Sequence, residues 1–437
     1  MRQFRLFRSD RPDPADPGET VSRVRRMRTQ RHLVGFWFDT CGHQLQGTTL
    51  TSRGCGRWGE FRPGIGATWP LDGAIAQELC KLKEDRQASR LETETFGFDL
   101  AQWIALRCQE LVDRLGPLDD ELLAICFHDD GWRLLDFDGR TYFNPSIDAS
   151  RLAELSGLSV ISSLRQADVA AGGTGDPLEP LALWFLLADR SSKTAASSRV
   201  VLKLDSPAGL YYLPASDGLD AEHPTIEFRS MRLWTLLKEI FAADKKQPSR
   251  FVGTHAVQGK KLDPLNQALI DLARQYRLEF HADCSTELTS QVESLTTHSQ
   301  GTQADMARTA VEWLVHETRE MVVLPRSGHP PVDEVIVAGE EVDDGFVFQR
   351  LREQLPDVHI RSIGEWGWDW RTLNSTLAGI LGFMHIDQQP ASLPWLTQAD
   401  VPRLHGVLSP GRPAAWRRLL TEMADYRPPP MKLREAV

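Results

Sequence analysis

Short apolar runs typical of strands alternate with amphipathic stretches typical of helices, and this alternation starts twice along the chain. The first series begins at Leu33 to Phe38, and the second begins with a hairpin made by Val200 to Leu204 and Gly209 to Leu213. Alternating strands and helices build mixed or parallel sheets covered by helices. At 437 residues the chain is too long for a single compact core. We therefore predict an α/β protein with two lobes, each opening on a hairpin.

The periodicity of apolar residues sets the expected bounds of the other elements. Further strands are expected at 122–127, 158–161, 335–338 and 358–362, and a Gly-rich stretch at 41–58 is expected to form the first hairpin. Helices are expected at 75–82, 100–115, 149–155, 181–187, 231–241, 265–276, 304–323, 347–355 and 372–384. We divide the chain into a tail at 1–30, an N-terminal lobe at 31–192 and a C-terminal lobe at 193–437.

The tail is rich in arginine and poor in apolar residues. Such a segment buries too little apolar surface to offset the entropy lost on ordering, so we expect it to be solvated and disordered. A tether to an anionic surface is the alternative. The arginines are Arg2, Arg5, Arg8, Arg11, Arg23, Arg25, Arg26 and Arg28.

The composition excludes several classes of partner. A formal charge of -10 argues against nucleic acid, which needs a basic surface. A membrane span needs about 18 consecutive apolar residues, and the sequence has no such run, so we expect a cytoplasmic protein. Its six cysteines include no Cys-x-x-Cys pair, which argues against a zinc site or a disulfide framework. We therefore predict no bound structural metal.

A glycine-rich stretch follows the strand at 158–161. Residues 163–180 read SLRQADVAAGGTGDPLEP and contain three glycines and two prolines. Glycine tolerates positive φ and has no Cβ, so such a loop lets backbone amides approach a ligand closely. A tight turn within one lobe is the alternative interpretation.

This stretch resembles the segment of anhydro-N-acetylmuramic acid kinases that combines Arg-x-x-Asp, Gly-Gly-x-Gly and Pro-Leu-x-Pro. The resemblance runs more thinly from about residue 33 to residue 400, and it includes a strand ending at ICFHDDG and the later SLPWLTQAD. It implies a two-lobed actin-like ATPase (ribonuclease H-like) fold with an interlobe cleft. It also implies ATP-dependent opening and phosphorylation of 1,6-anhydro-N-acetylmuramic acid, a sugar of peptidoglycan turnover. The implied sugar-binding residues are His128, Arg165, Asp168, Gly172, Gly173 and Gly175.

Two glycine-rich turns that would meet the nucleotide depart from the family pattern. The first strand runs into FDTCGHQLQG, where Thr40 is kept and Gly42 is available with a shifted register. The adenosine turn reads GEEVDDG, in which Gly339 is kept and acidic residues crowd the rest. Carboxylates beside a triphosphate are costly without metal. Thr40, Gly42 and Gly339 are therefore the remaining nucleotide-binding candidates.

The second hairpin turn and the catalytic motif depart as well. The turn, Asn-Ile-Gly-Gly in the family, has Lys203 and Asp205 in place of asparagine and glycine. The base falls on Glu227 or Arg229 according to the register, and only a glutamate is chemically able to act as a base. A glutamate of the last helix is replaced near Asn374. Phosphoryl transfer depends on positioning and electrostatics, so we expect a catalytically impaired member of the family.

Three functions follow from this resemblance. The first is an anhydro sugar kinase with an unusual nucleotide site, which would need ATP and Mg²⁺. The second is a non-catalytic sensor of the anhydro amino sugar or a muropeptide, and the third is a dimeric scaffold, neither of which would need a cofactor. The resemblance also implies a homodimer.

Overall fold

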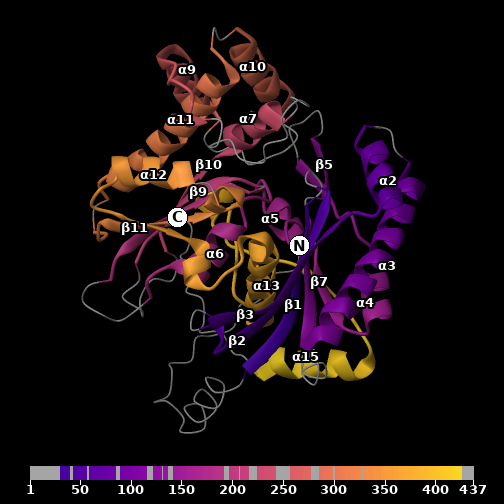
Figure 1. Cartoon of the computed structure of the whole chain (residues 1–437). Helices are drawn as coiled ribbons and strands as arrows, with labels where there is room; N and C mark the ends of the chain where they lie inside the picture. Colours follow the sequence, from indigo (N-terminus) through magenta and orange to yellow (C-terminus); the bar gives the residue numbers. More distant parts are fainter. Residues whose placement is uncertain are drawn as a thin grey trace, which may run out of the picture.

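Two sheets with the same core strand order organise the molecule (Figure 1). The computed structural model describes residues 30–39, 43–56, 59–84, 89–115, 122–129, 131–135, 141–190, 196–205, 207–215, 224–242, 256–276, 285–298, 301–326, 328–343 and 345–425. The predicted tail at 1–30 lies, except for Gln30, outside this set.

The first sheet has the order β13-β7-β4-β1-β2-β3. Strands β2 and β3 are antiparallel neighbours, whereas β1, β4 and β7 run parallel. In β1, residues 31–39 are all buried, as expected for a strand covered on both faces. The strands are β1 (Gln30–Asp39), β2 (Gln44–Arg53), β3 (Glu60–Pro70), β4 (Leu122–Asp129), β7 (Ser159–Ser162) and β13 (Val407–Ser409).

The second sheet has the order β10-β9-β8-β11-β12. Its first three strands form an antiparallel meander, and β11 and β12 run parallel to β8. This repeats the hairpin-plus-parallel-strands pattern of the first sheet. The strands are β8 (Ser198–Lys203), β9 (Gly209–Leu213), β10 (Glu227–Ser230), β11 (Val332–Ala338) and β12 (His359–Ser362).

Helices form three layers around the two sheets (Figure 1). One hydrophobic cluster joins the first sheet to α2 (Gly73–Glu84), α3 (Arg90–Leu115) and α4 (Ala149–Ser156). A second joins the outer face of the second sheet to α7 (Arg232–Ala242), α9 (Asp263–Gln275), α10 (Ser285–His298), α11 (Gln303–Val323) and α12 (Gly345–Gln354). A third, shared by both sheets, contains α6 (Glu179–Leu187) and α13 (Leu373–Ile386). The order of layers is therefore helices, sheet, α6 and α13, sheet, helices.

The smaller elements lie at the edges of this arrangement. They are β5 (Trp132–Leu135), β6 (Thr141–Asn144), α5 (Gln166–Ala170), α14 (Pro394–Thr397), α15 (Pro413–Asp425) and three 3₁₀ helices, η3 (Glu340–Asp343), η4 (Ile363–Trp366) and η5 (Trp370–Thr372). Local chemistry ends several elements. Asp148 caps the N-terminus of α4 by accepting the Arg151 N–H, and Gly157, at φ 74°, ends the same helix in the left-handed region.

The duplicated strand order confirms the predicted two-lobed, ribonuclease H-like α/β fold. The division at residue 193 stays a prediction. It assigns the C-terminal segment to the second lobe, yet β13 pairs with β7, and Ser375 on α13 lies against Thr48 of β2 at 2.6 Å between hydroxyl oxygens. The last part of the chain therefore returns to the first sheet.

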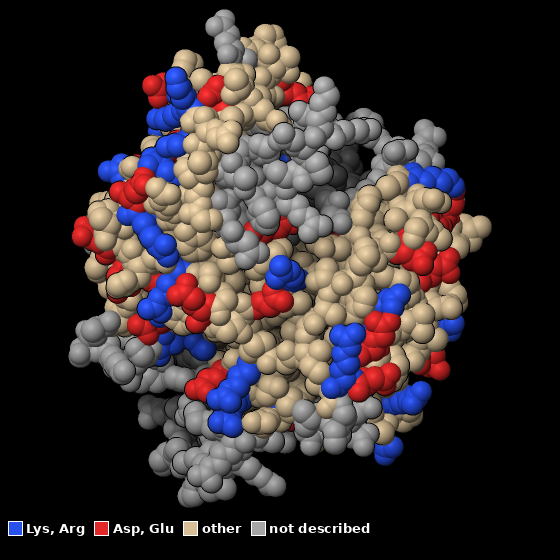
Figure 2. Space-filling model, viewed as in Figure 1, with Lys and Arg blue, Asp and Glu red and all other residues tan. Residues whose placement is uncertain are grey.

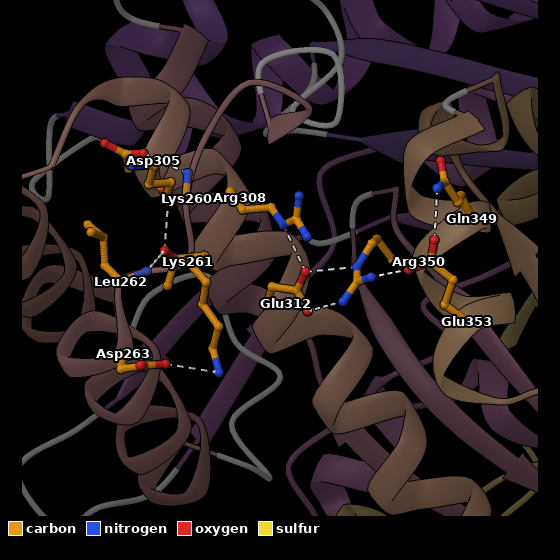
Figure 3. Close-up of polar contacts among 11 residues, drawn as sticks. Lys260, Lys261, Leu262, Asp263, Asp305, Arg308, Glu312, Gln349, Arg350 and Glu353 are labelled. Atoms are coloured by element: carbon orange, nitrogen blue, oxygen red, sulfur yellow. Dashed lines mark hydrogen bonds and ion pairs between the residues drawn. The ribbon is translucent and has the colours of Figure 1, made fainter.

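A carboxylate joins α11 to α12 on the outer side of the second lobe (Figure 3). Glu312 accepts from Arg308 Nε at 2.8 Å and from Arg350 Nε and Nη2 at 2.8 and 3.0 Å. The paired Glu312 carboxylate raises the pKa of the Arg350 guanidinium. Arg308 also lies over the ring of Phe346, 4.9 Å from its centroid. These contacts fix α12 on α11.

Replacing Glu312 by alanine is expected to lower the free energy of unfolding by about 1–2 kcal/mol, because two half-buried guanidinium groups lose their shared partner. Urea unfolding followed by tryptophan fluorescence measures this loss. Glu353→Ala is the matched control, since the Glu353 side chain is 41% exposed and contacts only one of the two arginines. Equal losses in the two variants would contradict the bridging role of Glu312.

The surface carries mixed charge. On the face seen in Figure 2, acidic and basic side chains are interspersed rather than gathered into a patch of one sign. No described helix combines the length and the apolar character needed to span a bilayer.

Candidate functional site

The glycine-rich loop after β7 is built around a buried carboxylate. Asp168, in the short helix α5, is fully buried. Its Oδ2 accepts the Gly175 N–H at 2.8 Å, and its Oδ1 accepts the Thr397 hydroxyl at 2.7 Å. The Thr174 N–H donates to the Thr397 carbonyl at 2.7 Å. Asp168 and Thr397 thus join the loop to the segment that follows α13.

Backbone conformation and close packing require glycine at the three glycine positions of this loop. Gly172 and Gly175 have φ of 84° and 81°, in the left-handed region. A Cβ on Gly173 would lie 2.2 Å from Asp168 Oδ2. The expectation that the loop bares its amides to a ligand is wrong, because the N–H groups of residues 172–175 all donate to acceptors within the protein. The glycines instead allow the loop to close over Asp168.

Gly173→Ala should therefore be more harmful than Gly172→Ala. The first places a methyl group against a carboxylate that cannot move without losing its partners, which should cost about 2–3 kcal/mol. The second places a methyl group at an ordinary contact distance of 3.8 Å from Asp400 Oδ2 and should cost only the left-handed backbone, about 1 kcal/mol. Chemical denaturation of both variants gives the comparison. Equal stability of the two would contradict the assigned geometry.

Arg165 connects the loop to the end of β4. Its Nε donates to Asp176 Oδ1 at 2.8 Å and its Nη1 to the Asp129 carbonyl at 2.7 Å, with only 5% of the residue exposed. Asp129 in turn accepts from the Ser146 N–H and hydroxyl at 2.7 and 2.5 Å. The guanidinium therefore serves as an internal brace.

Two buried histidines lie beside this brace. His128 stacks edge-on against Trp37, with ring centroids 4.3 Å apart, and its Nε2 has no hydrogen-bond partner. Burial lowers the pKa of His128 well below its usual value, and the nearby Arg165 and His405 lower it further. His405 Nδ1 donates to the Leu164 carbonyl at 2.5 Å, so its buried Nε2 carries a lone pair without a donor. Sequence reasoning missed His405, because only the pairing of β13 with β7 brings it here.

The second hairpin turn, between β8 and β9, carries an internal ion pair. Lys203 is fully buried, and its Nζ donates to the Pro207 carbonyl at 2.5 Å and lies 3.4 Å from Asp205 Oδ1. Asn374 Nδ2, at the start of α13, donates to Asp205 Oδ2 at 3.0 Å. A phosphate would meet a carboxylate in this turn, and the lysine is already engaged. The residues present do not fit a nucleotide phosphate.

The candidate base lies on β10 and is paired. Arg326 Nε and Nη2 donate to the two oxygens of Glu227 at 2.7 and 2.9 Å. In the alternative register, Arg229 pairs with Glu317 at 3.1 Å. Neither arrangement presents a free carboxylate as a general base.

Of the three remaining nucleotide-binding candidates, the structure describes Gly339 but not Thr40 or Gly42. Gly339 ends β11 with φ 125°, and a Cβ there would lie 3.0 Å from the Asp205 nitrogen, so this turn packs directly on the second hairpin turn. Thr40 and Gly42 lie outside the described residues. Among the described residues, no group of three or more His, Cys, Asp or Glu side chains is placed to hold a metal ion.

Comparisons with known proteins find similarity to one family of enzymes. The family model "Anhydro-N-acetylmuramic acid kinase" matches residues 61–208, which include the glycine-rich loop and the second hairpin turn. The chain is 23% identical over 343 residues to an anhydro-N-acetylmuramic acid kinase of Nitrosomonas europaea, covering 78% of this chain and 90% of that protein. It is 27% identical over 372 residues to the corresponding kinase of Chromohalobacter salexigens, covering 81% and 94%.

Among solved structures, a gluconate kinase from Lactobacillus acidophilus is similar at a TM-score of 0.36 and 9% identity, covering 91% of this chain and 97% of that one. The fold assignment rests on the strand order of the two sheets, not on this low likeness. The family model over residues 61–208 and these relatives make the chain similar to anhydro-N-acetylmuramic acid kinases.

Proposed function

We propose that the protein recognises 1,6-anhydro-N-acetylmuramic acid, or a muropeptide that carries it, and that its ATP-dependent kinase activity is severely weakened or lost. The family supplies the substrate class, since its members are named for this sugar. We further propose that the protein works in the cytoplasm, in the recycling of peptidoglycan, and as a homodimer.

The observation that carries the impairment is the second hairpin turn. Lys203, Asp205 and Asn374 occupy it with a buried ion pair and a hydrogen bond. A carboxylate in this place repels phosphate. The Lys203 ammonium, which would offset this repulsion, is already bonded to the Pro207 carbonyl and paired with Asp205. The pairing of Glu227 with Arg326 is a second, independent obstacle, because a base must be free to accept a proton.

The sugar side supports recognition in an indirect way. Arg165, Asp168 and His128 are buried and form the scaffold of the loop, so we propose that they position the loop rather than contact the sugar. Gly172 is exposed, and a Cβ there would meet only the Asp400 carboxylate, at an ordinary contact distance of 3.8 Å. A ligand would therefore approach the loop at Gly172.

The test is a direct assay of phosphorylation. Purified protein is mixed with ATP, Mg²⁺ and the anhydro sugar, and the 6-phosphate product is sought by mass spectrometry. We expect no product above that of a sample without enzyme, or only a trace. Turnover at ordinary kinase rates would refute the impairment.

A non-catalytic sensor of the sugar is the second candidate. It is favoured by the loop's internal hydrogen bonds, which hold its shape without any nucleotide. Binding of the sugar without turnover would favour the sensor, whereas binding of neither sugar nor nucleotide would favour a scaffold.

A further inference from the structure

Three of the residues that depart from the family pattern contact one another in this structure. Lys203 and Asp205 are paired in the second hairpin turn, and Asn374 of α13 donates to the same aspartate. Lys203 and Asp205 are neighbours in the turn, but Asn374 is 169 residues from Asp205, so its contact with the turn is a property of the fold. A buried ammonium group without an anionic partner is expensive, which means that a lysine at this place requires a carboxylate near it. These three departures from the family pattern therefore compensate one another, because the carboxylate of Asp205 is the partner of both other side chains.

A fourth and a fifth residue extend the cluster. Glu179, in the first turn of α6, is 1% exposed, and the Tyr211 hydroxyl on β9 donates to its Oε1 at 3.1 Å. Burial raises the pKa of Glu179, and the nearby Lys203 partly offsets this effect. Glu179 Oε2 has no hydrogen-bond partner. The Lys203 ammonium is thus paired with Asp205, and Glu179 is a second buried carboxyl group, bonded to Tyr211 of the same hairpin.

The members of this cluster come from both halves of the molecule. Lys203, Asp205 and Tyr211 belong to the β8–β9 hairpin of the second sheet. Glu179 and Asn374 begin α6 and α13, the two helices between the sheets (Figure 1). Helix α13 is fixed to the first sheet, because Gly35 of β1 approaches it so closely that a Cβ would clash with the Ser375 carbonyl, and because Arg31 and Asp387 form a buried ion pair at 2.5 Å.

We propose that this cluster of Glu179, Lys203, Asp205, Tyr211 and Asn374 is an interlobe lock that holds the two lobes in one relative position without a nucleotide. The apolar contacts between α13 and the second sheet bury surface, but hydrophobic contacts are non-directional. On their own they would permit the second sheet to slide along α13. Directional hydrogen bonds and a buried charge fix one arrangement, since any shift would leave the charge unpaired. The proposal concerns the lobes alone and does not depend on the sugar or on turnover.

The first experiment measures the distance between the lobes. Genetically encoded spin labels are placed at Leu106 on α3 and Gln275 on α9, which are exposed positions in the two lobes. For the otherwise wild-type chain we expect one narrow distance distribution, unchanged by millimolar Mg²⁺ and a non-hydrolysable ATP analogue. Asn374→Ala combined with Tyr211→Phe should broaden it at least twofold. Gln349→Ala, which removes an amide bonded to Glu353 within α12 (Figure 3), should leave it unchanged.

A distance distribution that stays narrow in the Asn374→Ala, Tyr211→Phe variant would overturn the lock. A shift of the distance between the labels when nucleotide is added to the protein with an unmodified cluster would overturn it as well. Failure of the lock would leave the phosphorylation assay untouched, so the two proposals fail separately.

The second experiment tests the charge balance. Lys203→Met should lower the thermal midpoint by several degrees, and adding Glu179→Gln and Asp205→Asn should restore at least half of that loss, because the buried negative charges are removed with their counter-ion. Absence of any rescue in the triple variant would overturn the lock as a charged unit.

Discussion

Asp168→Ala is expected to lower the free energy of unfolding by about 4 kcal/mol, the largest effect of any single substitution considered. Two donors, the Gly175 N–H and the Thr397 hydroxyl, would lose their acceptor in a fully buried site. Buried donors bonded to a charged acceptor are worth about 1.5–3 kcal/mol each. Urea unfolding followed by tryptophan fluorescence measures the change.

The matched variant is Asp168→Asn. Its amide oxygen still accepts the Gly175 N–H, and its amide nitrogen donates to Thr397 once that hydroxyl rotates. We expect less than half of the loss seen with alanine. A cost below about 1 kcal/mol for Asp168→Ala would contradict the role given to this carboxylate.

Stability should also fall as the pH drops below about 6.5, the ordinary value of histidine in an unfolded chain. Burial is the main cause that lowers the pKa of His128, His385 and His405 in the folded protein. Below pH 6.5 the unfolded chain binds protons at these residues that the folded protein excludes, so the free energy of unfolding decreases with falling pH. Each proton that only the unfolded chain binds contributes up to about 1.4 kcal/mol per pH unit, so the three histidines set an upper limit of about 3 kcal/mol on the loss between pH 6.5 and 5.5.

Glu179 acts in the opposite direction. Burial raises its folded-state pKa, so its contribution to stability is greatest below the unfolded value of about 4.3 and is lost as the pH rises through the folded value. The measurement is therefore made in wild type and in Glu179→Gln by urea unfolding between pH 7.5 and 5.5. The variant should show the steeper fall. A flat profile in Glu179→Gln would mean that the three histidines take up protons in the folded state.

Much of the fold could be predicted from periodicity. The expected strands at 33–38, 122–127 and 200–204 correspond to β1, β4 and β8, and the expected helix at 372–384 corresponds to α13. These elements are long or continuously apolar, so their pattern is clear. Strand β3 was not predicted, because Pro63, Gly64 and Gly66 interrupt an edge strand whose side chains are mostly exposed.

Other elements lacked a readable pattern. The polar sequence of α10 and the three-residue strand β13 give little periodicity. In the tryptophan-rich stretch EWGWDW, Gly367 has φ 81° and separates two 3₁₀ helices, a break that apolar periodicity does not reveal. Trp368 is buried, while Trp366 lies 4.3 Å from the Arg199 guanidinium carbon.

The candidate site was predictable in its location and less so in its chemistry. The spacing of Arg165, Asp168 and the three glycines pointed to one loop, and the structure gathers them there. Their roles depend on partners that are distant in the chain, such as Thr397 for Asp168 and Asp129 for Arg165. No local sequence pattern shows that the Asp168 carboxylate holds the loop together rather than binding a ligand. Likewise, the sequence shows Lys203 and Asp205 only as the loss of a phosphate-binding turn. Their role in a buried cluster with Asn374 and Glu179 becomes apparent only in the structure.

The most direct test of the account is calorimetric titration of the wild-type protein, in separate runs, with the anhydro sugar and with a non-hydrolysable ATP analogue plus Mg²⁺. We predict saturable heat with the sugar and none with the nucleotide at millimolar concentration, because Lys203, Asp205 and Asn374 fill the turn that would receive its phosphates. Saturable binding of the nucleotide in the micromolar range would contradict this account.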